Sequence, residues 1–314
     1  MTGAPSCDRR PPRSQRVDLE SDLWACLTTD DGRERLAALD DDELPQLAGD
    51  LLQRDPYGTV GLLRAAFSIV GSPARPVAAV EHSLWCAVRE ARWLRGRLRH
   101  EDVGEALQVE GCEHLQACMG HPTVLISPMT LGTHDALAIV RTLHARHGRG
   151  APLACYGEGM ESLVSLRPEL SRLFVGAAMA GMRRALDTLS SGGIFVTYPD
   201  FVYAGHVALP GRLFGTPRPL SAGFAGLCAR PGTRLLPCLM TRRGSRLQVR
   251  FYPAVVYADP AGLPAGAPGR NVARRVVARV TSGILEALIR ERPEQWRLLA
   301  TLTHEAPELQ TAPA

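Results

Sequence analysis

The chain has 314 residues, of which 36 are Lys or Arg and 32 are Asp or Glu, and its formal net charge is +4. Every basic residue of this group is Arg, which excludes a Schiff-base lysine, a pyridoxal phosphate anchor and the lysine of a phosphate loop. A chain of this length can bury a large core, either as one long α/β domain or as a core with a helical extension. We expect no cofactor, and we attribute the absence of Lys to genomic base composition.

The ends of the chain carry no recognisable membrane signal. Residues 1–16 are rich in Arg and Pro and contain no apolar segment, so we expect a disordered tail and not a signal peptide. Residues 304–314 are expected to form a second disordered tail. No run approaches the ~20 apolar residues of a membrane span, and residues 173–182 have the length of a buried helix. We therefore expect a soluble, cytoplasmic protein without stable membrane insertion.

The eight cysteines form no C-x-x-C pair, which is typical of reduced thiols. Cys112, His114, Cys118 and His121 lie close together in the sequence. Their spacing matches neither a zinc knuckle nor the i, i+4 pairing of ligands on a helix. We therefore expect no metal site.

Residues 17–107 are predicted to form helices, because Leu and Trp recur there at mixed helical spacings. Arg92, Arg95 and Arg99 share one face of the last of these helices. Such a stripe is usually a solvated face, and the alternative is that it binds phosphate or an acidic partner.

From residue 120 onward, apolar strands alternate with helices. We predict strands at 122–127, 151–156, 193–198, 234–240 and 245–252, and helices at about 134–147, 168–190, 219–230 and 270–291. Such alternation indicates a largely parallel sheet, to which the last hairpin adds an antiparallel strand. The predicted fold is α/β, with a largely parallel mixed sheet flanked by helices over 108–303 and an N-terminal helical region over 17–107.

The segment Ser127–Asp135 (SPMTLGTHD) directly follows the first predicted strand. In sheets of this kind, ligands bind at the carboxyl ends of the strands. Gly132 permits a close approach of the backbone. Asp135, at the start of the next helix, suits either a catalytic acid or an ordinary charge in the first helical turn.

Five further segments accompany this one in a fixed order: 109–115, the G-G-x-x-x-x-x-P-D strand at 192–200, a loop ending in Phe-Gly at 207–215, a helix and strand at 219–237, and P-E-Q-W at 293–296. Together the six resemble the lipid A late acyltransferase family, a branch of the lysophospholipid acyltransferase superfamily. Thr130–Asp135 (TLGTHD) aligns without gaps with that family's H-L-G-N-W-E. The resemblance covers about residues 109 to 300 and implies an acyltransferase.

The resemblance implies a general base at the position of Thr130 and an orienting acid at Asp135. A threonine hydroxyl is no base near neutral pH, so we expect Thr130 to position a substrate or to donate to an oxyanion. His134, one helical turn later, is an alternative base, and otherwise it is a polar residue on a solvent-facing turn. Asp135 cannot orient His134, because adjacent helical residues point about 100° apart. His206 in a later loop is a further candidate base.

The resemblance also places a substrate pocket around a second set of residues: Met129, Gly132, Asp200, Phe214, Gly215 and Gly223. Asp200 has an alternative role as a turn-forming residue after a proline.

A site without a side-chain base requires an acceptor that is nucleophilic by itself, such as a hydroxylamine, a hydrazine or a thiol. The family's membrane helix and its terminal H-R-R triplet are not found here. We therefore expect a soluble acyltransferase that moves an acyl or aminoacyl group to an amine, hydroxylamine or hydroxyl of a small molecule in specialised metabolism.

The expected donor is an acyl carrier protein, coenzyme A or an aminoacyl-tRNA, and the expected donor-binding residues are Arg92, Arg95, Arg99, Arg274, Arg275 and Arg279. There are two alternatives to this hypothesis. One is an inactive family member that acts as a binding or scaffold protein, and the other is a peripheral lipid acyltransferase held on a membrane by its Arg-rich helices.

Overall fold

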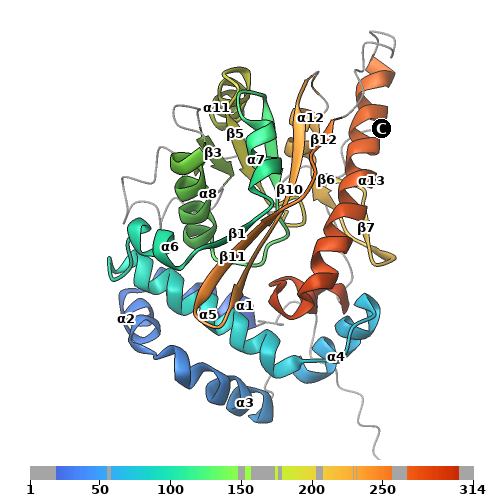
Figure 1. Ribbon diagram of the computed structural model, residues 1–314. Coiled ribbons are helices and arrows are strands. Elements are labelled where there is room, and N and C mark those ends of the chain that lie inside the picture. Colours follow the sequence, from blue (N-terminus) through green and yellow to red (C-terminus); the bar gives the residue numbers. More distant parts are fainter. Residues whose placement is uncertain are drawn as a thin grey trace, which may run out of the picture.

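The computed structural model describes residues 19–54, 58–147, 153–156, 174–175, 179–202, 208–228, 230, 232–256 and 267–303. Within these ranges a mixed, mostly parallel sheet is flanked by helices, and a helical N-terminal region lies against one end of the sheet (Figure 1). The predicted fold class and the predicted N-terminal helical region are confirmed.

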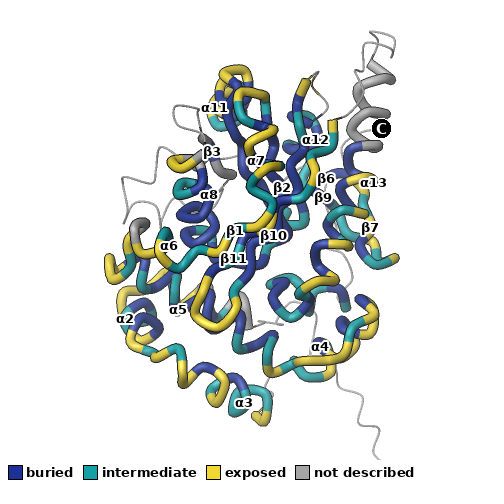
Figure 2. Tube along the Cα trace, in the orientation of Figure 1, coloured by how far each residue is buried: buried dark blue, intermediate teal, exposed yellow. Residues whose placement is uncertain are grey.

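The centre of the sheet consists of buried, mostly apolar strands. β2 (Thr123–Ile126) pairs in parallel with β5 (Ile194–Thr197) on one side and with β10 (Arg234–Arg243) on the other. Every residue of β2 and β5 is buried, and Figure 2 shows this part of the chain in dark blue. Continuous burial is typical of parallel strands covered on both faces, which is why these strands appear in the sequence as unbroken apolar runs.

The outer strands complete the described sheet in the order β1-β11-β10-β2-β5-β3-β4. β11 (Arg246–Phe251) runs antiparallel to β10 after a turn at Gly244, whose φ is +60°, so the predicted hairpin is confirmed. The remaining strands are short: β1 (Gln108–Glu110), β3 (Leu153–Tyr156), β4 (Phe174–Val175), β6 (Ala208–Leu209), β7 (Arg212–Leu213), β8 (Thr216–Pro217), β9 (Leu220–Ser221) and β12 (Val255–Val256).

Helices cover the sheet. α8 (Thr133–His147) and α13 (Ala267–Glu291) lie on opposite sides of the strands in Figure 1. The other elements of this part are α6 (His100–Ala106), α7 (Cys112–Cys118), α11 (Met179–Ser190), α12 (Ala222–Cys228) and the 3-10 turns η4 (Pro293–Gln295) and η5 (Leu299–Thr303). None of the helices in the described ranges combines the length and the apolar composition that crossing a membrane requires.

The helix predicted over 168–190 is wrong in its first part. Phe174 and Val175 form β4, which pairs in parallel with Cys155 and Tyr156 of β3, and α11 begins only at Met179. Phe and Val favour strands, and pairing at the edge of the sheet outweighs a helical spacing.

α5 (Pro76–Leu94) is the central helix of the N-terminal region. It contacts α1 (Leu19–Thr28), α2 (Asp30–Ala38), α3 (Leu44–Arg54) and α4 (Thr59–Val70), and it also contacts α8 of the α/β part. Its Trp85 and Trp93 are almost completely buried. α5 therefore joins the helical region to the sheet.

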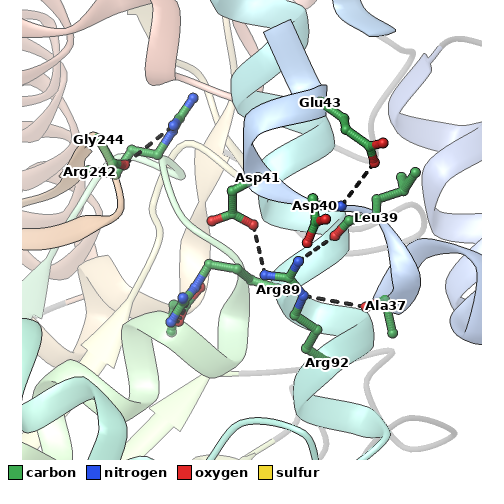
Figure 3. Close-up of polar contacts among 10 residues, drawn as sticks. Ala37, Leu39, Asp40, Asp41, Glu43, Arg89, Arg92, Arg242 and Gly244 are labelled. Atoms are coloured by element: carbon green, nitrogen blue, oxygen red, sulfur yellow. Dashed lines mark hydrogen bonds and ion pairs between the residues drawn. The ribbon is translucent and has the colours of Figure 1, made fainter. Parts of the chain in front are cut away.

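Arg92 attaches α5 to the chain that follows α2. Its Nη1 donates to Asp41 Oδ1 at 2.7 Å, in the 3-10 turn η2 (Asp41–Glu43), while Nη2 and Nε donate to the carbonyls of Leu39 and Ala37 (Figure 3). Carbonyls at the end of a helix have no partner within it, and the guanidinium supplies one here.

The stripe predicted as a solvated face is therefore wrong at Arg92, whose side chain is 20% exposed. Arg95 pairs with Glu34 at 3.0 Å and with Asp30 at 3.5 Å, whereas Arg99 is exposed.

We expect Arg92→Ala to lower the free energy of unfolding by about 2 kcal/mol, because Asp41 and the helix-end carbonyls lose a charged donor. Arg99→Ala removes an exposed Arg of the same stripe and should change it by less than about 0.5 kcal/mol. Urea unfolding followed by circular dichroism measures both values. Equal effects would contradict the structural role of Arg92.

Candidate active site

The loop that leads from β2 to α8 is fixed by several elements. The amide of Ser127 donates to the carbonyl of Thr197 at 3.3 Å, and the carbonyl of Met129 accepts from the amide of Arg297 at 3.0 Å. The hydroxyl of Thr130 donates to the carbonyl of Met240 on β10. The segment Ser127–Asp135 is therefore held rigidly at the carboxyl ends of the central strands.

Thr130 is 1% exposed and is bonded through both of its oxygens. Its hydroxyl proton is engaged with Met240, and its carbonyl accepts from Nε2 of His82 on α5. The Nδ1 of His82 accepts from Nε of Arg242 at 3.3 Å, which assigns the ring proton to Nε2. Burial, together with the charge of Arg242, lowers the pKa of His82 to about 3 and keeps the ring neutral.

Asp135 is held by α5. Its carboxylate receives Nε of Arg89 at 2.8 Å on Oδ2 and Nη2 of Arg89 at 2.8 Å on Oδ1, and Trp93 Nε1 donates to Oδ1 at 3.1 Å. The side chain of Asp135 is 1% exposed. Asp135, predicted as the orienting acid of the motif, has a guanidinium as its partner and no histidine at position 130 to orient.

His134 forms a second buried pair with α5. Its Nδ1 is bonded to the carboxylate of Glu90, which also accepts from the backbone amide of His134 at 3.3 Å. Burial alone would raise the pKa of Glu90, but the charge and hydrogen bonds of His134 lower it below its usual value. The alternative of His134 on a solvent-facing turn is wrong, because the residue has no exposed surface.

Glu90 also accounts for Gly132. A Cβ at this position would lie 2.7 Å from Glu90 Oε2, so only glycine fits without displacement of the carboxylate. Glu90 was not among the predicted site residues. A signal was nevertheless present, because its helical neighbours at i±3 and i±4 are Cys86, Ala87, Trp93 and Leu94, and a carboxylate on an apolar face needs a buried partner.

Asp200 follows β5 and has a different environment from Asp135. Its Oδ2 accepts from the amide of Met129 at 3.0 Å and from Nε1 of Trp296 at 2.7 Å. Its Oδ1 is buried and has no hydrogen-bond partner among the described residues. Burial raises the pKa of Asp200 to about 6, against the effect of these donors.

Phe214 lies next to Trp296, with a ring-centroid separation of 6.3 Å. It occupies the turn between β7 and β8, where its φ is +52°, followed by Gly215 at +76°. This conformation costs a non-glycine residue about 1–2 kcal/mol. Glu286 of α13 accepts from the Phe214 amide at 2.7 Å, and the guanidinium of Arg290 lies 5.0 Å from the ring centre, which holds the aromatic ring in place.

The structure thus links Met129 and Phe214 through Asp200 and Trp296, and the predicted residues Thr130 and Gly215 directly follow Met129 and Phe214 in the chain. Gly223 of α12 lies two residues after Ser221, whose amide donates to the Pro199 carbonyl at 3.0 Å. Arg279 is exposed on α13. The side chains of Arg274 and Arg275, and the whole of His206, lie outside the described residues. In the part of the chain that is described, no three His, Cys, Asp or Glu side chains are arranged to hold a metal ion.

We expect Asp135→Asn to lower the free energy of unfolding by about 3 kcal/mol, because Arg89 would keep a mostly buried charge without its counter-ion. The matched control is Asp31→Asn, which breaks a pair whose side chains are 75% and 79% exposed and should cost less than about 1 kcal/mol. Chemical denaturation measures both. A similar loss for the two variants would show that the buried pair has no special weight.

His82 predicts a pH dependence of stability. An unfolded histidine titrates near pH 6.5. Folded His82 has a pKa of about 3, so between these values the unfolded state binds the extra proton. The contribution of His82 is complete above pH 6.5 and is lost as the pH falls. We expect a loss of about 2 kcal/mol from about pH 8 to about pH 5.

His82→Gln is the control for this effect. A glutamine amide keeps a donor for Thr130 and an acceptor for Arg242 but does not titrate. The slope between about pH 8 and about pH 5 should flatten in this variant. An unchanged slope would assign the pH dependence to other groups.

No protein-family model matches this sequence, and no curated protein sequence is significantly similar to it.

Proposed function

We propose that this protein is an acyltransferase that moves an acyl or aminoacyl group from an activated donor to a nitrogen or oxygen nucleophile of a small molecule. The support is spatial. Five of the six segments that resemble the lipid A late acyltransferase family meet at one place, through Met129, Asp200, Phe214, Ser221 and Trp296. Sequence order alone does not require such a meeting.

The position of this meeting point suits group transfer. It lies where β2 and β5 end, which is the usual position of ligands in α/β sheets. Asp200 provides a carboxylate, the loop after β2 provides rigid backbone, and Phe214 provides an apolar ring that is only partly buried. An acyl donor needs an apolar wall for its chain and a polar group near its carbonyl, and both types of group are present.

A second candidate function is binding or scaffolding without catalysis. One observation favours it: the hydroxyl of Thr130 and the carboxylate of Asp135 are both engaged in bonds within the protein. A family member that has lost its base would keep these residues for their contribution to the fold.

Turnover with a simple acceptor separates the two candidates. The purified protein is incubated with hydroxylamine and, separately, with acetyl-, octanoyl- and palmitoyl-coenzyme A, the same chains on an acyl carrier protein, and a set of aminoacyl-tRNAs. Hydroxamate formation is measured by mass spectrometry. We expect at least one donor class to react faster than without the protein, because the site holds the reacting groups together.

Phe214→Ala should lower kcat/KM for that donor by about tenfold or more, since it removes the apolar ring next to Trp296, which donates to Asp200. Arg35→Ala, which breaks an exposed ion pair in α2 of the N-terminal region, should leave kcat/KM unchanged. If no donor reacts above background, the enzymatic proposal is abandoned in favour of the scaffold.

A further inference from the structure

Asp200 is a buried carboxylate that is bonded on one oxygen only. Two donors from different elements, Met129 and Trp296, converge on Oδ2, while Oδ1 has no partner among the described residues. Native proteins rarely leave a buried polar atom unpaired, and such atoms are often found where a ligand or reactant completes the bonding. Asp135 shows the contrast, because its two oxygens receive four hydrogen bonds.

No described cation forms an ion pair with Asp200. The charged groups that contact Phe214 have their own partners there: Glu286 accepts from the amide of Phe214, and Arg290 stacks on the Phe214 ring. Arg297 follows Trp296, and its amide donates to Met129. The carboxylate of Asp200 is therefore positioned by neutral N–H groups, which leaves its basicity available.

The other described candidates for a base are engaged. Thr130 is a hydroxyl that donates to a carbonyl, and His82 uses both ring nitrogens within the fold. His134 is bonded through its Nδ1 to the carboxylate of Glu90. We propose that Asp200 is the general base of the site, and that its Oδ1 takes the proton of the acceptor as the acceptor attacks the donor carbonyl.

This inference rests on the proposed function, and the step balances as follows. The acceptor N–H or O–H gives its proton to Oδ1 while a new N–C or O–C bond forms to the carbonyl carbon. The tetrahedral intermediate then breaks its C–S bond, or its C–O bond for an aminoacyl ester. The proton on Oδ1 passes to the departing sulfur or oxygen. The products are the amide, hydroxamate or ester and the free thiol or alcohol, and the carboxylate is restored.

The environment of Asp200 suits this role. A pKa of about 6 leaves most of the carboxylate ionised at neutral pH and makes it a stronger base than an exposed aspartate. Such a base still removes protons poorly from an ordinary alcohol. The inference therefore narrows the acceptor class to nucleophiles that react readily, such as hydroxylamines and hydrazines, over simple hydroxyls.

The test combines a pH–rate profile with a titration that does not depend on turnover. With hydroxylamine and the donors named above, we expect kcat/KM to fall on the acid side with an apparent pKa near 6. Asp200→Asn should lower kcat by about 100-fold or more with little change in KM, and it should remove the acid limb. Asp200→Glu should recover part of the rate.

Trp296→Phe separates a base from a merely structural residue. It removes one donor to Oδ2, which raises the pKa of the carboxyl, so the acid limb should move to higher pH. If Asp200 only connected the loop after β2 to Trp296, this variant would change the rate without moving the acid limb of the profile. Circular dichroism of each variant confirms that the fold is retained.

Carbon-13 NMR of the aspartate carboxyl groups, assigned with Asp200→Asn, gives the second readout. A midpoint near pH 6 for Asp200 supports the assignment, and a midpoint below about 4, the value of an ordinary aspartate, overturns it whether or not turnover is detected. An active enzyme in which Asp200→Asn keeps its rate and its acid limb overturns the role of Asp200 alone. A protein that is inactive with every donor, although Asp200 titrates near 6, overturns the proposed function and the base with it.

Discussion

The structure around the candidate site depends on two buried side-chain pairs between α5 and α8. Arg89 and Glu90 are adjacent on α5, and they bind Asp135 and His134, which are adjacent in the first turn of α8. Buried charges cost several kcal/mol each to dehydrate, and this cost is offset only by good geometry and additional hydrogen bonds. Arg89 binds the Asp135 carboxylate through two nitrogens, and the backbone N–H of His134 donates a hydrogen bond to Glu90.

These pairs set the position of the chain on either side of them. They fix the start of α8, and the short loop before α8 then places Thr130 against β10 and Met129 against Asp200. The same pairs attach the helical region to the sheet, because α5 also carries the contacts to α2 and α3. Fold and site are therefore held by a single buried cluster.

The sequence predicted the parts of the fold that depend on local pattern. The runs at β2 and β5 were identified because parallel strands buried on both faces are apolar throughout, and the hairpin of β10 and β11 because a turn separates two strand-forming segments. Phe174 and Val175 were assigned to a helix instead, because two residues are too few to show an alternation. Their strand exists only through the pairing with β3.

The chemistry of the site was less predictable. Met129 and Asp200 were expected near each other through a family resemblance, but the surroundings of Asp200 depend on Trp296, which is 96 positions away. Arg92 binds Asp41 rather than a phosphate, and this too was not predictable, because no local pattern reveals which distant group a side chain will contact. The buried role of Glu90 could have been predicted, because its apolar helical neighbours are visible in the sequence.

The contacts of Trp296 and Arg297 affect the order in which the site forms during synthesis. The indole of Trp296 and the amide of Arg297 close the loop after β2 from the far end of the described chain. While the chain emerges from the ribosome, the sheet strands and α5 are available long before these residues. Asp200 therefore lacks one of its two donors until the segment 293–297 is released, so the site cannot be complete before that segment is available.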